Sequence, residues 1–432
     1  MRRQVYSLRR LSAKEFARIV EQLGAGPVAV GIDVSKRELV LMLRRQDATF
    51  LGPYCAANPE QIPQIVQLLR QVGSRGAFQV AMESSGTYGD PFRQALSDAG
   101  IELRRVEAKQ SHDYAEVFDG VPSQHDGKDA AVIAELCAIG KSRRWEYEPV
   151  SEKDSRMQLA VEWLDAQDRI RRLWLGRLEA LLARHWPEAT SVMELRSGTL
   201  LRALAHYQGP AALAADDKAL EKLLRWGGTW LKKDKAQALI DSARRTLGVR
   251  QNAVDQERLG RCAKAAREAT LQINRCRGEL RQLAKGNRVI EAQAKAVGVA
   301  TACVLWTRLG DPHDYPSAGA YRKAMGLNLS EQSSGQYKGL PHVSKRGDPL
   351  VRRWMHMAAL RLIARNTPVA RWYRDKRRRS SDNHRCAITA VVRRLAIALH
   401  RVPVGGREFD PARLFPGHAA AQAPQTTGGL MS

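Results

Sequence analysis

Four acidic residues in the first third of the chain have the types and spacing of a metal-dependent site for phosphodiester chemistry. Asp33 ends the apolar run VAVGID, and Glu83 ends a second run, FQVAME. Asp126 and Asp129 begin the helical pattern DGKDAAVIAELCAIG, and their i, i+3 spacing places both on one face of the first turn. Mg²⁺ prefers such oxygen-only, multiply anionic sites. Two such ions about 4 Å apart activate a nucleophile and stabilise the leaving oxygen. We therefore expect Mg²⁺ as cofactor, with Mn²⁺ as a substitute.

Each of these carboxylates also has a purely structural interpretation. Asp126 and Asp129 are suited to capping a helix and to its positive end. Asp33 is suited to closing a turn, and Glu83 to an exposed rim. From the residues alone both interpretations stay open.

Basic residues are concentrated towards the other end of the chain. Residues 341–401 contain 16 Lys and Arg against 3 Asp, a net charge of +13, which is half of the +25 of the whole chain. Trp372 and Tyr373 lie within this block, and basic residues beside aromatic ones suit phosphate contact with base stacking. A solvated charged face is the alternative. The residues expected to contact nucleic acid are Lys345, Arg346, Arg352, Arg353, Arg374, Lys376, Arg377, Arg378 and Arg379.

The composition of the whole chain favours a polyanionic partner. The chain has 432 residues, of which 44% are hydrophobic and 27% charged, which is ordinary for a globular protein of about three domains. Its net charge of +25 favours nucleic acid, because each phosphate contact releases condensed counterions. No run approaches the ~18 apolar residues of a membrane span. The N-terminus lacks the apolar region of a secretory signal, and the six Cys form no CxxC pair. We therefore expect a cytoplasmic protein with reduced thiols and no membrane partner.

The elements that must position these residues fall into five blocks. Residues 1–26 are a basic extension with a helical pattern, and residues 27–150 alternate strand and helix signals, which predicts an α/β domain. Residues 151–290 are almost purely helical. Residues 291–412 predict a second compact, mostly helical unit, and residues 413–432 are typical of a disordered tail.

The α/β block contains five strand candidates and three helical patterns. The strands are expected in VAVGIDVS, ELVLML, ATFLG, AFQVAME and IELRRVEA. The helices are expected over Pro59–Val72, Pro91–Ala99 and Lys128–Ile139.

The helical middle contains a heptad-like seam. Apolar or small residues follow each other at alternating steps of three and four, which is the period of a coiled coil. A helix packed within the chain and a dimerising coiled coil are equally compatible with this pattern. The seam consists of Leu259, Cys262, Ala266, Ala269, Ile273, Cys276, Leu280 and Leu283.

The C-terminal unit contains a candidate hairpin and a candidate nucleophile. KAVGVATACVLWTRLGD reads as helix–turn–helix, a motif whose backbone N–H groups can meet phosphates, although an ordinary packed helical pair fits equally. Further along, Ser333-Ser334-Gly335 precedes the basic segment SKRGDP. A serine hydroxyl is a weak nucleophile that needs a base, a metal or concentrated positive charge. The neighbouring Lys and Arg residues are suited to supply that charge, while a flexible loop is the alternative.

The motifs GIDVSK, MESSGTY and HDGKDA, followed by SSG and SKRGDP, resemble one bacterial insertion-sequence transposase family. That family includes the pilin-gene invertase and recombinases programmed by a structured bridge RNA. The resemblance spans roughly residues 28–412, and His125 departs from the small polar residue of many members. It implies an RNase H-like, RuvC-like N-terminal domain with Asp33, Glu83, Asp126 and Asp129 as its metal-binding set. It also implies a C-terminal transposase domain with a helix-hairpin-helix-like element, in which Ser334 is the nucleophile.

By this resemblance the chain is a transposase, a site-specific DNA recombinase that forms a covalent phosphoserine intermediate. Its implied partners are donor DNA, target DNA, a noncoding guide RNA and further copies of itself in a dimer or tetramer, associated with the bacterial nucleoid. Three alternatives stay open. They are a RuvC-like junction-resolving nuclease without a covalent step, an invertase that uses DNA only, and a catalytically silent nucleic-acid-binding scaffold.

Overall fold

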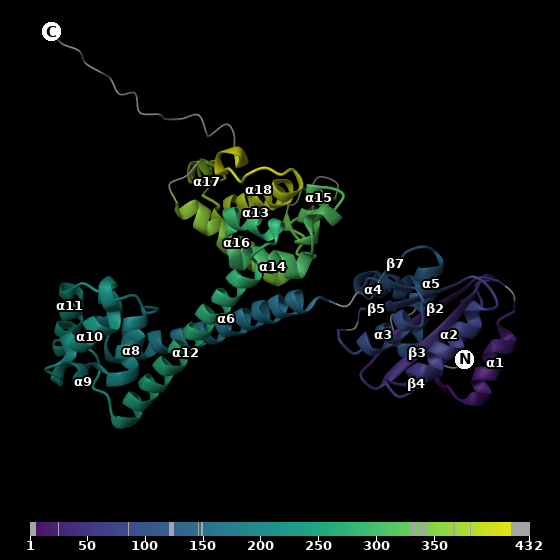
Figure 1. Ribbon diagram of the computed structural model, residues 1–432, viewed down its shortest axis with the longest axis horizontal. Helices are drawn as coiled ribbons and strands as arrows, with labels where there is room; N and C mark the ends of the chain where they lie inside the picture. The colour runs from purple at the N-terminus through teal and green to yellow at the C-terminus, as the bar shows by residue number, and fades with distance from the viewer. Residues whose placement is uncertain are drawn as a thin grey trace, which may run out of the picture. The chain divides into compact units, whose positions relative to one another are not determined.

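The protein folds as two compact units, Met1–Pro149 and Val150–Ser432, in a computed structural model (Figure 1). The residues it describes are 6–24, 26–84, 86–120, 125–145, 147, 150–330, 333–334, 337–338, 342–365, 368–380 and 382–415. The tail at 416–432 lies outside the described residues.

The first unit is built on one mixed sheet of seven strands. Their order across the sheet is β1-β4-β3-β2-β5-β6-β7. β2, β3 and β4 form an antiparallel meander, whereas β5 pairs parallel to β2 and β6 parallel to β5. The strands are β1 (Arg9–Arg10), β2 (Val28–Val34), β3 (Glu38–Arg45), β4 (Phe50–Ala57), β5 (Phe78–Glu83), β6 (Leu103–Val106) and β7 (Arg143–Arg144). This order and these directions are those of an RNase H-like sheet, so the expected α/β fold class is confirmed.

Helices cover both faces of this sheet. One core joins the sheet to α1, α2 and α3, and smaller cores join the opposite face to α4 and α5. Ile19 of α1 is fully buried in the larger core, so this part of the N-terminal extension belongs to the first unit. The helices are α1 (Ala13–Gln22), α2 (Ile62–Gly73), α3 (Asp90–Asp98), α4 (Ala108–Asp119) and α5 (Asp126–Ala138). The sequence patterns anticipated α2, α3 and α5, while α4 and the short edge strands went unpredicted.

The second unit is helical and is organised around a long antiparallel pair, α6 (Glu152–His185) and α12 (Ala253–Leu283) (Figure 1). At one end of the pair, Lys153 Nζ donates a hydrogen bond to the carbonyl of Lys285. At the other end, the amide of Val249 donates to the carbonyl of Arg184 at 2.8 Å. Seven of the eight seam residues of α12 are buried within the chain, and Leu283 is half-buried. The seam is therefore an intramolecular helix contact.

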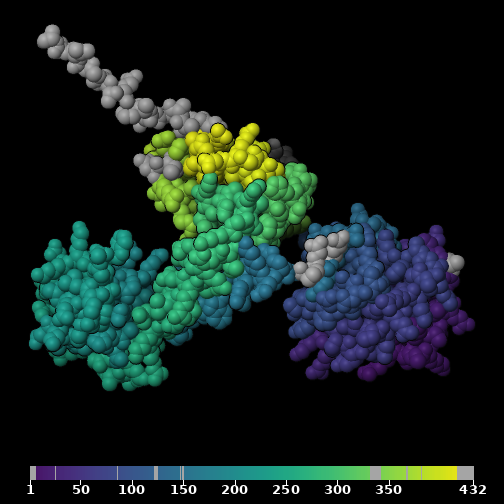
Figure 2. Space-filling model, viewed as in Figure 1, coloured from purple at the N-terminus to yellow at the C-terminus, as the bar shows by residue number. Residues whose placement is uncertain are grey.

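A group of short helices, which we call the tip subdomain (residues 186–252), closes the end of the pair where α6 ends and α12 begins (Figure 2). It contains α7 (Ala189–Val192), α8 (Gly198–Tyr207), α9 (Pro210–Ala215), α10 (Ala219–Gly227), the single 3₁₀ turn η2 (Gly228–Trp230) and α11 (Lys233–Arg244). Its core is shared with Leu178 and Leu182 of α6 and with Leu259 and Ala263 of α12.

The remaining helices form a second core at the other end of the pair. They are α13 (Arg288–Val297), α14 (Val299–Leu309), η3 (Pro312–Asp314), α15 (Ala318–Ala324), α16 (Pro349–Ala364), α17 (Pro368–Arg379), α18 (His384–Val404) and η4 (Pro411–Leu414). Two short antiparallel ladders lie between α15 and α16: β8 (Leu329–Ser330) with β11 (His342–Val343), and β9 (Ser333–Ser334) with β10 (Tyr337–Lys338). In the described part of the chain, no helix is both long and apolar enough to span a membrane.

Candidate active site

Strand alternation determines which face of the first unit carries the acidic residues. Along β2, Val30 and Ile32 enter the larger core, so Gly31 and Asp33 lie on the opposite face, which α5 covers. A Cβ atom on Gly31 would lie only 2.1 Å from the carbonyl oxygen of Ala130. The absence of a side chain at this position therefore lets α5 lie directly on β2, with the first turn of α5 beside the end of the strand.

This packing brings three carboxylates from two elements together. Oxygen atoms of Asp33, Asp126 and Asp129 lie within 4.8 Å of one another. Asp126 is exposed, whereas Asp33 and Asp129 are half-buried. Asp126 and Asp129 both lie in the first turn of α5, where the positive end of the helix favours acidic groups. Within the described chain these three form the one group with the spacing of a metal-ligand set.

Burial and mutual repulsion raise the pKa values of Asp33 and Asp129. Burial, followed by the charges of Asp129 and Asp126, raises the pKa of Asp33 to about 6. Burial and the charge of Asp126 also raise the pKa of Asp129, against a smaller lowering effect of Lys128 and His125. The fold thus holds negative charges close together in a site that is partly removed from water. A divalent cation would relieve this repulsion, and the all-oxygen donor set fits one.

Glu83 ends β5, on the strand adjacent to β2, but it is outside the group of three. Its carboxylate accepts a hydrogen bond from the hydroxyl of Ser111 on α4. Its charge contributes to the raised pKa values of both Asp33 and Asp129, so it lies within electrostatic reach of the cluster. The sequence pattern found Glu83 but gave no signal for Ser111, because α4 itself was not predicted.

A buried lysine also adjoins the cluster. Lys128 lies between Asp126 and Asp129 in sequence, but its side chain is 1% exposed and points away to Asp119 of α4, with Nζ to Oδ1 at 2.7 Å. This ion pair attaches the first turn of α5 to the end of α4. The sequence offers no signal that separates this lysine from the many exposed ones.

In the second unit, Ser334 lies in β9, opposite Tyr337 of β10. The ladder of β8 and β11 pairs Ser330 with His342. In sequence it therefore encloses the ladder of β9 and β10. Gly335 lies outside the described residues.

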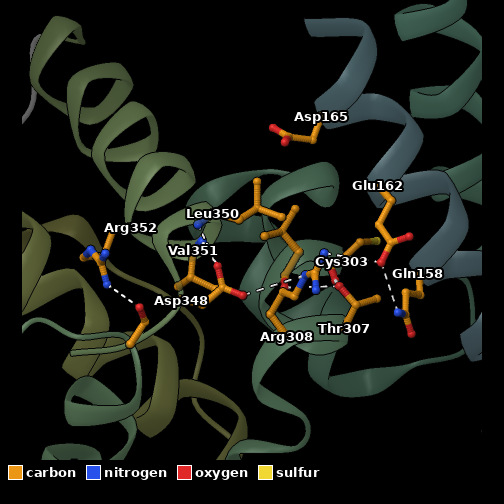
Figure 3. A network of polar contacts seen from close by, with 12 residues as sticks. Gln158, Glu162, Asp165, Cys303, Thr307, Arg308, Asp348, Leu350, Val351 and Arg352 are labelled. Carbon is orange, nitrogen blue, oxygen red and sulfur yellow. Dashed lines mark hydrogen bonds and ion pairs between the residues drawn. The ribbon is translucent and has the colours of Figure 1, made fainter. Parts of the chain in front are cut away.

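The loop between β11 and α16 is attached to the helical core by an ion-pair network (Figure 3). Asp348 caps α16 by accepting hydrogen bonds from the amides of Leu350 and Val351, at 2.6 and 3.2 Å. Arg308 of α14 lies 3.8 Å from Asp348 and 3.4 Å from Glu162 of α6. The SKRGDP segment is therefore fixed at its Asp-Pro end.

The predicted nucleic-acid-binding residues differ in how free they are. Lys345 and Arg346 are exposed, whereas Arg352 donates to the carbonyl of Gly347 at 2.7 Å. Arg353 forms an ion pair with the buried Asp165 of α6, and burial lowers its pKa. In α17, Lys376 is half-buried and Arg377 is exposed but binds Asp382. Arg374, Arg378 and Arg379 are also exposed.

The expectation that Trp372 and Tyr373 stack on bases is wrong for this conformation. The Trp372 ring stacks on Phe415, with centroids 3.9 Å apart and planes 19° from parallel. Tyr373 is 6% exposed and its hydroxyl contacts His384. Both rings are part of the core beneath α17, and the sequence pattern did not separate aromatic residues that pack from those that lie beside phosphates.

Two family models and one relative agree on one protein family. A DEDD transposase model of the IS110 type matches residues 30–187, and a model described as "Transposase IS116/IS110/IS902 family" matches residues 292–374. The insertion element IS110 uncharacterized 43.6 kDa protein of Streptomyces coelicolor is 23% identical over 358 residues, covering 77% of this chain and 85% of that protein. Among solved structures, RuvC of T. thermophilus in complex with a Holliday junction substrate is 17% identical, with a TM-score of 0.22, covering 27% of this chain and 99% of that one.

Proposed function

Because this chain belongs to the IS116/IS110/IS902 family of transposases, which are DNA strand-transfer enzymes, we propose that it moves an insertion sequence through a covalent phosphoserine intermediate. The observation that carries the proposal is the meeting of Asp33, Asp126 and Asp129 at the β2–α5 contact. The basic surface around Lys345 and Arg346, beside the segment that contains Ser334, supports the role of the second unit.

The carboxylates of Asp33, Asp126 and Asp129, with Glu83 beside them, would hold Mg²⁺ or Mn²⁺. Such an ion supplies Lewis-acid activation of the scissile phosphate and charge stabilisation of the leaving oxygen. The Asp33 and Asp129 side chains must be ionised to bind it, and the charge of the ion would lower their raised pKa values.

In the cleavage step the Ser334 hydroxyl oxygen forms a bond to the phosphorus of the scissile phosphodiester. The bond from that phosphorus to one deoxyribose oxygen breaks, and the serine proton is transferred to the leaving oxygen through solvent. Lys345 and Arg346 are exposed, and their charges would offset charge on the phosphate. Rejoining reverses the step: a deoxyribose hydroxyl of the new partner strand attacks phosphorus and the Ser334 oxygen leaves. The number of phosphodiester bonds is conserved, so no external energy source is needed.

The proposal includes a noncoding guide RNA that selects donor and target DNA by base pairing, and assembly of the protein as a dimer or tetramer. The strongly basic balance of the chain, +25, supports a nucleic-acid partner of either kind. Purification from cells that carry the native flanking DNA, followed by sequencing of the bound RNA, tests the guide. A single discrete RNA with segments matching the element ends is expected, and a mixture of cellular RNA would contradict guidance.

The serine step is tested with a matched pair of variants, Ser334→Ala and Ser333→Ala. Both residues lie in β9, so the two substitutions make equivalent changes to the same short strand. We expect Ser334→Ala to abolish a protein–DNA adduct on a denaturing gel and Ser333→Ala to retain it. Equal cleavage by wild type and Ser334→Ala without any adduct would contradict the covalent step. It would favour a junction-resolving nuclease, since the acidic cluster on an RNase H-like sheet needs no serine.

A further inference from the structure

We propose that the tip subdomain carries a binding surface for single-stranded nucleic acid, centred on Trp230 and the lysines that follow it. Residues 188–291 lie outside both family matches, so almost the whole tip subdomain lies beyond the matched residues. The inference deepens the proposed function and rests on it in one respect, namely that nucleic acid is the substrate.

Trp230 is the most exposed large hydrophobic residue in the described chain, at 95% of its full accessible surface. Trp226, four residues earlier, packs within the fold. Its ring centroid lies 5.3 Å from that of His206 in an edge-to-face contact, and the guanidinium carbon of Arg202 lies 5.3 Å from the Trp226 ring centroid. An indole left wholly in water costs hydrophobic free energy and is a common feature of binding sites. The same segment thus contains one packed tryptophan and one that is presented to solvent.

The turn that presents Trp230 is built by two glycines. Gly228 has φ of +55°, in the left-handed region that disfavours other residues. A Cβ atom on Gly227 would lie 2.3 Å from Cβ of Leu231, so only glycine lets Leu231 fold back onto the end of α10. Leu231 therefore closes the turn on the inner side, while Trp230 is held outside.

Three lysines surround the start of the next helix. Lys232 is the N-cap residue of α11 and makes no side-chain capping hydrogen bond, and Lys233 and Lys235 lie in the first turn with a single acidic residue, Asp234. All three lysines are exposed, and in the described part of the chain none forms an ion pair. Cations at the positive end of a helix are destabilising, and a bound anion offsets that cost.

An exposed indole beside uncompensated cations is the recognition chemistry of an unpaired nucleotide segment. The base stacks on the ring, and the backbone phosphates meet the lysines. In a nucleic-acid duplex each base pair is already stacked on its neighbours, so the faces of the bases are not available to Trp230. The surface therefore selects single strands, which a guide RNA loop or a displaced DNA strand would supply.

The test measures binding of the full-length protein to three labelled probes of equal length: an oligouridylate, an oligothymidylate and a DNA duplex. We expect Trp230→Ala to weaken single-strand binding about 5- to 100-fold and to leave duplex binding unchanged, whereas Trp230→Phe, which keeps an aromatic face, retains most of the affinity. Replacing Lys232, Lys233 and Lys235 by Gln should reduce the salt dependence of single-strand binding by about 2 in the log–log slope. Leu247→Ala is the matched control, because Leu247 lies in the same subdomain and is 92% exposed but has no ring.

Stronger loss on the oligouridylate assigns the surface to RNA, and stronger loss on the oligothymidylate assigns it to a displaced DNA strand; both support the inference. Unchanged single-strand affinity in Trp230→Ala overturns it while leaving the proposed transposition chemistry intact. A change in self-association by sedimentation velocity, without a change in nucleic-acid affinity, also overturns it, because the surface would then bind protein. If wild type binds none of the probes, the inference and the proposed function fail together.

Discussion

Replacing Asp33 by Asn should stabilise the metal-free first unit at neutral and alkaline pH. The pKa of Asp33 rises from 3.8 to about 6 on folding, mainly through burial and through the charges of Asp129 and Asp126. The ionised folded state is therefore penalised. A shift of about 2 units corresponds to about 3 kcal/mol, and screening by water at this half-buried position reduces the expected gain to about 1–3 kcal/mol.

The pH dependence follows from the same shift. Below about pH 3 Asp33 is protonated in both states, so wild type and Asp33→Asn should have the same stability. Between about pH 4 and pH 6 the carboxyl is ionised in the unfolded state but still protonated in the folded state, so the wild type loses stability over this range and the variant does not. Above about pH 7 Asp33 is ionised in both states and the difference is complete. Mg²⁺ should then stabilise wild type more than the variant, because the variant lacks one ligand.

Hydrogen exchange of the β2 amides, measured by mass spectrometry on the full-length chain, reports the free energy of opening of this unit. Asp98→Asn is the control: Asp98 is an exposed carboxylate of the same unit, and we expect a change within about 0.5 kcal/mol at every pH. A variant Asp33→Asn that is no more stable than wild type at about pH 8, or one that gains equally at about pH 4, would refute the electrostatic reasoning.

Three further substitutions test the packing that positions the two units' functional segments. Gly31→Ala should push α5 off β2, because the new Cβ would meet backbone atoms at 2.1 and 2.3 Å, and we expect loss of divalent-cation binding by calorimetry together with at least about 2 kcal/mol of stability. Arg353→Ala should cost about 2 kcal/mol in urea unfolding, because Asp165 is buried and, among the described residues, would retain only Arg169 as an ion-pair partner; Asp165→Asn in the same background should recover part of the loss. Ile273→Ala should cost about 2–5 kcal/mol while leaving the oligomeric state in sedimentation unchanged, because this seam residue packs within the chain; dissociation of an oligomer would contradict that assignment.

The sequence patterns were sufficient for the five central strands of the sheet, β2 to β6, and for the identity of the cluster-forming acids. Apolar runs of strand length identified β2 and β5, and the i, i+3 spacing placed Asp126 and Asp129 on one helix face. What the patterns did not contain is the contact that joins them, because the close approach of α5 to β2 depends on Gly31 meeting a helix far along the chain.

Contacts between distant segments also explain why some of the predicted nucleic-acid-binding residues near the C-terminus are paired within the fold. Local sequence marks Arg353 as cationic and Trp372 as aromatic, but it does not show that Asp165 pairs with one and Phe415 stacks on the other. Partners from distant segments decide whether a charged or aromatic residue pairs within the fold or stays free to bind a ligand. Counting basic residues therefore overestimated how many of them are free.

The hydrogen bond from the amide of Val249 to the carbonyl of Arg184 holds together the two ends of the segment that forms the tip subdomain. The subdomain is thus an insertion with coincident ends, and its length can change during evolution without altering the register of α6 against α12. A homologue that replaces it by a short turn would keep the helical pair, and a homologue with a larger insertion would gain reach. Exchanging this module between related proteins is accordingly a way to change the surface that it carries while the helical pair stays constant.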